Sequence, residues 1–484
     1  MSDLAFGYGR RRPFAGRLQL ALGSLALGLV LLSVLPYGGV LPVTWTFLAG
    51  AILLLFLAQM ALDLVDPPGH ATRRLVVPAL LYGLALFWGL LQIWPGALSQ
   101  AADPAWSRVP GAAPRVSADP VNGAHMLLRL TAYAMVFWIV ARTAERTNGA
   151  SLLLIAIALF STVLAALGIY WAWIGENPVL GESASAVVTA TFGNRNSYAT
   201  YALIGLVANV ALYAERSTQG EAAPEGSLQR LRDFLERFFR GNWVFAIGAL
   251  LCLSAVLLTE SRAGTVSALL ALGALALAFA ADRRIRNVWV LATAAAIVVF
   301  AGVVLSAGVG GRLMVTGPDE MRFAVYGLVA DALADRPFAG FGIGSFEDSF
   351  RQYLTADQAA AEWDMAHNSY LENLFELGLI GALPFYGALL WIAGVVTRGV
   401  LTRRRNRVYA CCAFACLVGA GFHALFDFSL QMPATAALFA ALLAIGWSQS
   451  FPSREAAGPE TGPSAARAQA FFSSRRPATR TGEP

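Results

Sequence analysis

Long apolar segments recur along the whole chain, and they constrain the fold more than any other feature of the sequence. Hydrophobic residues make up 57% of the 484 residues, whereas charged residues make up only 13%. A soluble domain carries about 25% charged residues, and an apolar run of about 20 residues is long enough to span a hydrocarbon core as a helix. The sequence therefore predicts an all-α fold, a polytopic membrane helical bundle with about 12 transmembrane helices.

The apolar windows also predict how the chain is organised. Transmembrane helices 1–9 occupy residues 1–308, a large and partly helical outer loop occupies 309–376, transmembrane helices 10–12 occupy 377–450, and residues 451–484 form a tail rich in Pro, Gly, Ala and Ser that we expect to be disordered. The spans are predicted at 17–36, 42–62, 75–95, 125–141, 150–174, 197–214, 243–259, 263–281, 288–308, 377–396, 408–427 and 433–449.

Three further segments have a helical pattern outside the spans. Residues 228–240 have apolar side chains on one helical face and arginines on the other, which is typical either of a helix in the inner membrane interface or of a loop helix packed on the bundle. Within the large loop, helices are expected at 322–335 and 346–354. The run Ala339–Gly344 between them is not a dinucleotide-binding fingerprint and is interpreted as a tight turn.

The basic residues are divided unevenly between the segments that join the spans. All 35 of them are arginine. If the N-terminus is cytoplasmic, the outer segments hold only a minority of the arginines, namely Arg108, Arg115, Arg195, Arg262, Arg312, Arg322, Arg336 and Arg351. Cytoplasmic segments of membrane proteins carry an excess of arginine, so both termini are predicted to be cytoplasmic and the loop at 309–376 to face the outer side.

His367 is the first candidate for a chemical role. It lies at the end of the large loop, just before an apolar helix, and Asn368 could orient its ring, with Tyr370 close by in sequence. An imidazole titrates near neutral pH and can accept a proton from a hydroxyl group. A structural hydrogen bonder is the alternative interpretation.

Four arginines form a second candidate group. Arg195, Arg262 and Arg129 fall at or just inside the outer ends of spans, and Arg322 lies in the large loop. An arginine in such a position needs a partner. One interpretation is a structural ion pair, as between Arg262 and Glu260, or extension of the side chain to lipid headgroups; the other is a guanidinium cluster that binds a diphosphate.

His423 and Asp427 form a third group, spaced four residues apart in the predicted eleventh span. At that spacing the two side chains share a helix face, and we interpret them as a structural pair that braces the bundle. The sequence offers no third ligand for a metal at this spacing, and its four cysteines lie in apolar runs without a disulfide or metal pattern. We therefore expect no metal and no cofactor, and the sequence has no P-loop or basic patch that would indicate nucleotide or nucleic-acid binding.

Several of these segments, in this order, resemble the O-antigen ligase and Wzy-type polymerase superfamily. The matching segments are Phe192–Ala199, Ser261–Gly264, Arg322–Phe346, His367–Gly381 and His423–Ala434. The first half of the chain is similar in hydropathy only. Ala366 occupies a place at which some ligases carry a second histidine.

The resemblance implies a periplasmic-face glycosyltransferase of the bacterial inner membrane that needs neither metal nor ATP. It implies a glycan on undecaprenyl diphosphate as donor, and lipid A core, a growing polysaccharide or a protein as acceptor. His367 would match the catalytic histidine, Arg195 and Arg262 the donor-binding arginines, and Arg322 a loop arginine of that family. A single displacement would invert the anomeric configuration.

Two other classes of function remain open at this point. A transporter or flippase of lipid-linked saccharides is expected to show internal repeats, broken helices and ionisable residues at the bilayer midplane. The ionisable residues here gather instead at the outer ends of the spans, which favours an enzyme. A structural membrane protein would leave the outer arginines and His367 unexplained.

Overall fold

The computed structural model describes residues 13–183, 187–218, 242–280, 318–355 and 363–452. The described residues up to Phe451 belong to one compact unit. The predicted span at 288–308, the arginine-rich segment at 228–240 and nearly all of the tail lie outside the described residues.

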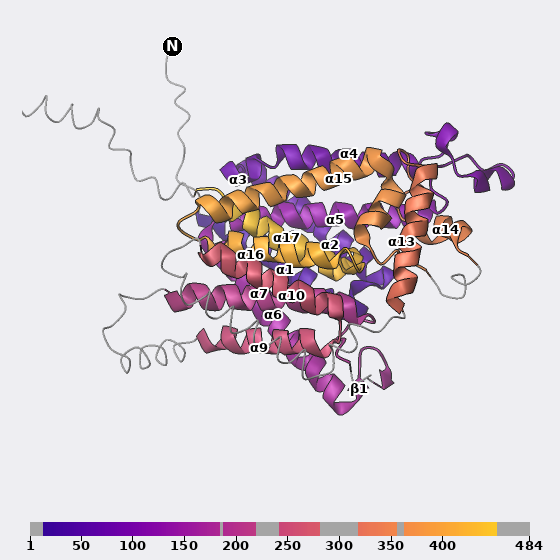
Figure 1. Ribbon diagram of the computed structural model, residues 1–484. Coiled ribbons are helices and arrows are strands. Elements are labelled where there is room, and N and C mark those ends of the chain that lie inside the picture. Colours follow the sequence, from indigo (N-terminus) through magenta and orange to yellow (C-terminus); the bar gives the residue numbers. More distant parts are fainter. Residues whose placement is uncertain (1–12, 184–186, 219–241, 281–317, 356–362, 453–484) are drawn as a thin grey trace, which may run out of the picture. The chain divides into compact units, whose positions relative to one another are not determined.

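Helices overlap all the remaining spans that the sequence predicts (Figure 1). Proline at the first helical position, where no N–H is needed, opens α2, α5 and α17. The long helices are α1 (Pro13–Leu32), α2 (Pro42–Val65), α4 (Val76–Ile93), α5 (Pro120–Ala144), α6 (Thr147–Ile174), α7 (Arg195–Thr218), α9 (Trp243–Leu258), α10 (Arg262–Ala280), α15 (Ser369–Thr402), α16 (Val408–His423) and α17 (Pro433–Gln449).

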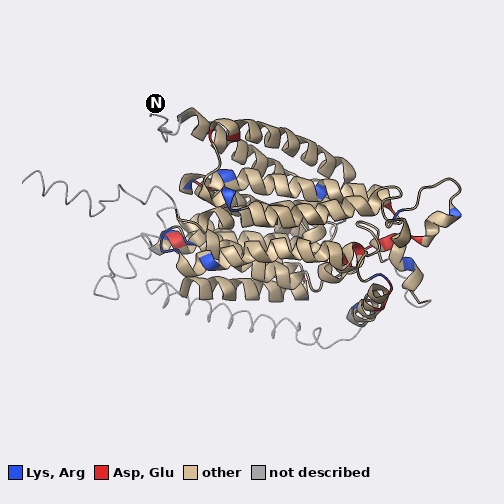
Figure 2. Cartoon of the chain, turned by 90° about the horizontal axis from the view of Figure 1, so that it is seen from above, with Lys and Arg blue, Asp and Glu red and all other residues tan. Residues whose placement is uncertain are grey.

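The long helices have the dimensions and polarity of membrane spans. Within the described residues, 8 helices are long and apolar enough to cross a membrane, and α9, α16 and α17 are shorter apolar helices. Figure 2 shows that most charged residues lie toward the two ends of the helices, so that the middle of the bundle has few charged residues. The predicted fold class, an all-α polytopic bundle, is confirmed.

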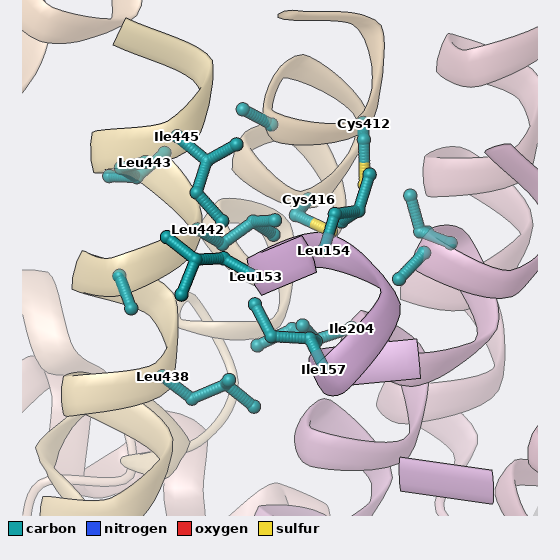
Figure 3. Packing of buried hydrophobic residues seen from close by; sticks show 14 of the residues in the cluster. Leu153, Leu154, Ile157, Ile204, Cys412, Cys416, Leu438, Leu442, Leu443 and Ile445 are labelled. Carbon is teal, nitrogen blue, oxygen red and sulfur yellow. The ribbon is translucent and has the colours of Figure 1, made fainter. Parts of the chain in front are cut away.

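The centre of the bundle is a dry apolar core. Leu153, Leu154 and Ile157 of α6 meet Ile204 of α7, together with leucines of α17 and the thiols of Cys412 and Cys416 on α16 (Figure 3). All four cysteines are buried and free, as expected for thiols in apolar runs. Because α7, α16 and α17 are packed tightly around this core, their ends are fixed relative to one another.

Smaller elements lie between the long helices. They are η1 (Tyr37–Gly39), α3 (His70–Arg73), η2 (Ser99–Ala101), η3 (Pro104–Arg108), the antiparallel pair β1 (Glu176–Asn177) and β2 (Glu182–Ser183), α13 (Pro318–Asp335), α14 (Phe346–Phe350), η5 (Arg351–Tyr353) and η6 (Ser429–Gln431). Helix α13 lies across one end of the bundle and packs on α15 (Figure 1). The predicted loop helices at 322–335 and 346–354 therefore correspond to α13 and to the consecutive turns α14 and η5.

Helix α15 is interrupted by its loop partner. Gly378 leaves the helical conformation at φ 59° and ψ −177°, close to the predicted start of the tenth span at residue 377. The loop at 337–342 crosses this break: Leu379 N–H donates to the Pro337 carbonyl over 2.9 Å, and Gly342 N–H donates to the Glu376 carbonyl over 2.9 Å. The backbone groups that the break frees are thus paired within the protein, as irregular backbone near a membrane requires.

Candidate functional site

Two of the predicted arginines begin neighbouring helices. Arg195 is the first residue of α7 and Arg262 the first residue of α10, and these helices pack against each other. A Cβ on Gly264 would lie 2.5 Å from the Ala199 Cβ, so the first turns of the two helices touch. Helix N-termini carry unpaired N–H groups and a partial positive charge that favours anions. The Arg195 side chain is exposed and that of Arg262 is half-buried there.

Three of the five non-glycine residues with positive φ among the described residues lie shortly before α7, α10 or α15. Ala190, Glu260 and His367 all have φ near +50°, a left-handed conformation that residues with a Cβ rarely adopt. Each precedes one helix N-terminus, that of α7, α10 or α15. Such strain persists only where the surroundings hold it, and it is commonest at functional sites.

His367 is reached from α13. The Tyr326 hydroxyl donates to the His367 carbonyl over 2.7 Å, and Arg322 lies one helical turn before Tyr326. Burial, with a further contribution from the Arg322 charge, lowers the pKa of the His367 imidazole from 6.5 to about 4. The ring is therefore neutral at pH 7 and able to accept a proton.

Aromatic rings surround the imidazole. The Phe428 ring centroid lies 4.9 Å from that of His367, and the Trp363 ring centroid lies 6.1 Å away. The Nδ1 atom of His367 is buried and has no hydrogen-bond partner among the described residues. Asn368, expected to orient the ring, instead caps α15, because its side-chain oxygen accepts from the Tyr370 and Leu371 N–H groups.

The His423–Asp427 pair is arranged differently from the prediction. Helix α16 ends at His423, so Asp427 lies beyond the helix and the two side chains do not share a helix face. Each contacts α7 instead: His423 Nδ1 is hydrogen-bonded to Thr200 Oγ1, and the Asp427 carboxylate accepts from Asn196 Nδ2 over 2.7 Å. The predicted span at 408–427 overran the helix because residues 424–426 are as apolar as the helix before them.

The remaining predicted residues divide between this region and another. The Tyr370 hydroxyl donates to the Gly421 carbonyl over 2.8 Å, which ties the start of α15 to the end of α16. Arg129 lies 5.3 Å over the Trp45 ring, and its charge acts on Glu376. The interactions described for Arg129 thus place it beside the segment of α15 around Glu376, to which the loop at 337–342 is bonded, rather than with His367.

Sequence reasoning missed Gln92. Gln92 is fully buried in α4; its amide donates to the Ala339 and Glu376 carbonyls over 2.7 and 2.9 Å, and its oxygen accepts from the Ile343 N–H over 3.1 Å. A single amide thus fastens the glycine-rich turn to α15. The signal was a lone polar residue in an apolar span, since a buried amide must find partners.

The chemistry that these residues offer is acid–base and electrostatic. In the described ranges, no group of three or more His, Cys, Asp or Glu side chains could hold a metal ion. A neutral imidazole, the nearby Arg322 and two helix N-termini that begin with arginine suit the binding of an anion and the transfer of a proton.

Together, the apolar helices and the polar residues at one end of the bundle define a multi-pass membrane protein with a candidate site at that end. The comparison with family models is more specific. Residues 247–386 match the family described as O-antigen ligase, and this match supports the O-antigen ligase/Wzy superfamily. None of the curated proteins compared with the chain matches it.

The matched segment confirms the resemblance predicted from the sequence. It includes Arg262, Arg322 and His367, whereas Arg195 and Asp427 lie outside it. A domain of this family indicates a glycosyltransferase-like enzyme that acts, in general terms, on a lipid-linked glycan and an acceptor.

Proposed function

We propose that the protein transfers a glycan from undecaprenyl diphosphate to an acceptor hydroxyl at the periplasmic face of the bacterial inner membrane. The observation that carries the proposal is the linkage of the His367 ring to the arginine-bearing helix α7. His367 contacts Phe428; the adjacent Asp427 bonds Asn196, the neighbour of Arg195. The family match to residues 247–386 supports the class of reaction.

In the proposed reaction His367 acts as the base. Its neutral imidazole accepts the proton of the acceptor hydroxyl while the oxygen attacks the anomeric carbon. The bond from that carbon to the diphosphate breaks, and the leaving group departs as the anionic lipid diphosphate. One displacement inverts the anomeric configuration. The glycosyl–diphosphate bond supplies the driving force, so that no ATP is required, and in this proposal guanidinium groups rather than a metal offset the charge of the leaving group.

The arginines would stabilise the leaving group. Negative charge grows on the phosphate oxygens as the bond breaks, and fixed guanidinium groups in a partly dehydrated site offset that charge. Arg195 and Arg262 extend from adjacent helix N-termini, while Arg322 acts from α13. Bound diphosphate would also offset the Arg322 charge that lowers the pKa of His367, and so make the imidazole a stronger base when donor is present.

A transporter or flippase of lipid-linked saccharides is the alternative. The break in α15 at Gly378 is a feature that transporters share. Here, however, the protein's own loop fills the break through backbone hydrogen bonds, and the ionisable groups described above lie at the bundle end. These observations favour the enzyme.

Alanine variants of His367 and Arg262 test the proposal in cells that lack the chromosomal copy of the gene. Polymer transfer should be abolished while the variant proteins remain in the membrane at wild-type abundance. R351Q is the matched control, because Arg351 is an exposed arginine of the same loop, paired with Glu347, and should leave transfer unchanged. Full activity of both alanine variants contradicts the proposal.

The same cells identify the acceptor. Uncapped lipid A core together with accumulated lipid-linked chains indicates a ligase, single attached repeats indicate a polymerase, and unmodified protein acceptors indicate a protein O-glycosyltransferase.

A further inference from the structure

The backbone around His367 needs support on both sides of the residue. Its left-handed φ of +51° is unfavourable for a residue with a Cβ. On one side, the His367 carbonyl accepts from Tyr326, and Asn368 caps α15. On the other side, the N–H of Ala366 donates over 2.7 Å to Glu372 Oε2.

Glu372 joins this backbone to a second segment. Its side chain is 1% exposed, and its other oxygen, Oε1, accepts from Gln431 Nε2 over 2.7 Å. Gln431 ends η6, three residues after Phe428, whose ring contacts the His367 imidazole. A single carboxylate therefore ties the strained backbone to the segment that forms one wall around the ring.

We propose that Glu372 is a positioning residue for His367, and that it acts through hydrogen-bond acceptance rather than through proton transfer. This inference rests on the proposed function of His367 as the base. Both Glu372 oxygens accept hydrogen bonds from N–H donors, so the carboxylate holds the two segments that carry these donors together. Holding the imidazole in place matters because a displacement of about 1 Å can reduce turnover about 100-fold.

The surroundings of Glu372 provide a conservative replacement. Gln431 Oε1 is buried and has no hydrogen-bond partner among the described residues. A glutamine at position 372 can accept from the Ala366 N–H with its oxygen and donate its amide to Gln431 Oε1 once the Gln431 amide has rotated. E372Q thus keeps both bonds and removes only the ionisable group, whereas E372L removes both bonds at similar volume.

Steady-state kinetics with purified lipid-linked donor and acceptor in proteoliposomes test the inference. E372Q should keep kcat within about threefold of wild type. E372L should lower kcat about 100-fold, with the KM for the donor changed by less than about threefold, because the diphosphate contacts are elsewhere. E347Q, an exposed carboxylate change in the same loop, is the control and should match wild type. Wild-type turnover by E372L overturns the inference, and so does loss of turnover by E372Q equal to that of E372L.

Two further variants keep the outcome decisive. If E372L does not accumulate in the membrane, Y326F removes the support on the other side of His367 with the loss of one hydroxyl; it should lower kcat about tenfold, and an unchanged kcat would show that the backbone support is dispensable. H367A distinguishes the proposed role of His367 as the base from the proposed role of Glu372 in positioning it. An active H367A refutes the proposed function itself, whereas an inactive H367A beside an active E372L refutes only the role of Glu372.

Discussion

The side-chain amide of Asn196 donates a 2.7 Å hydrogen bond to the carboxylate of Asp427, across 231 positions of sequence. Asp427 is fully buried and also accepts from the Phe428 N–H and the Ser429 hydroxyl. This bond joins the segment that carries Arg195 to the segment that contacts the His367 ring. Together with the His423–Thr200 bond, it is a contact through which the two parts of the candidate site keep their spacing.

Removal of this bond should reduce both stability and activity. N196A leaves one oxygen of a buried carboxylate without its donor, which costs about 1.5–3 kcal/mol. Thermal unfolding in detergent and glycan transfer should both show the loss. A double-mutant cycle with D427A isolates the pair; additive effects of the two changes would show that the bond does not couple the segments.

The glycine-rich turn should tolerate no side chain where it crosses its neighbours. Gly342 has φ +107°, and a Cβ there would lie 2.3 Å from the Ser117 Cα. G342A should therefore displace the turn from the Ser117 segment that it packs against and abolish transfer. Gly111 is a matched control, since its φ is +80° but nothing lies within 4 Å of its Cβ position. G111A should cost only about 1 kcal/mol of backbone strain and remain active; equal effects of the two variants would argue against close docking.

The pH dependence follows from the depressed pKa of His367, which is about 4 because of burial and, next, the Arg322 charge. A base must be neutral, so kcat/KM, which reports the free enzyme, should hold from pH 8 downward and fall only as the pH approaches the pKa. R322Q removes a charge that lowers the pKa, so the acid limb should move to higher pH. The donor titrates identically in both proteins and serves as the internal control. A limb that moves to lower pH in R322Q contradicts the assignment.

The ion pairs of Arg142, near the C-terminal end of α5, should affect the stability of the protein but not the rate of glycan transfer. Arg142 is 4% exposed and bonds Asp63 over 2.7 Å and Glu145 over 2.8 Å. R142M removes the cation that offsets the charge of two partly buried carboxylates, which keep their other hydrogen-bond donors, and should cost about 3–5 kcal/mol. Arg142 lies near the C-terminal end of helix α5, which begins at Pro120, so this cluster lies about 33 Å along the helix from its first residue at 1.5 Å per residue. Transfer per folded molecule should stay at the wild-type level, as measured by activity normalised to the fraction of folded protein.

Apolar run length predicted the helices well because the bilayer itself sets that length. The predicted spans at 42–62 and 75–95 correspond to Pro42–Val65 and Val76–Ile93. The predicted end of the eleventh span was wrong, since hydropathy does not distinguish the last helical turn from the apolar turn at 424–426. His423 and Asp427 consequently contact Thr200 and Asn196 rather than lying on one helix face.

The candidate site was predicted in part. The polar motifs indicated His367, Arg195 and Arg262, because an ionisable group at the end of a membrane span needs a partner or a ligand. The pairings across the fold could not be predicted from one sequence: nothing local in the sequence indicates that Glu372 holds the Ala366 N–H, or that Gln92 fastens the loop. Such contacts depend on how helices that are distant in sequence pack together, whereas a motif gives information only about residues close to it in sequence.

The central claim is that His367 performs chemistry on a lipid diphosphate held by arginines, and reconstitution tests it most directly. Binding and single-turnover transfer of a purified undecaprenyl-diphosphate glycan would be measured in proteoliposomes for wild type, H367A and the double variant R195Q/R262Q. The account predicts that H367A binds the donor as wild type does but transfers no glycan, and that the double variant loses donor binding. Transfer by H367A at the wild-type rate, or unchanged donor binding by R195Q/R262Q, would contradict it.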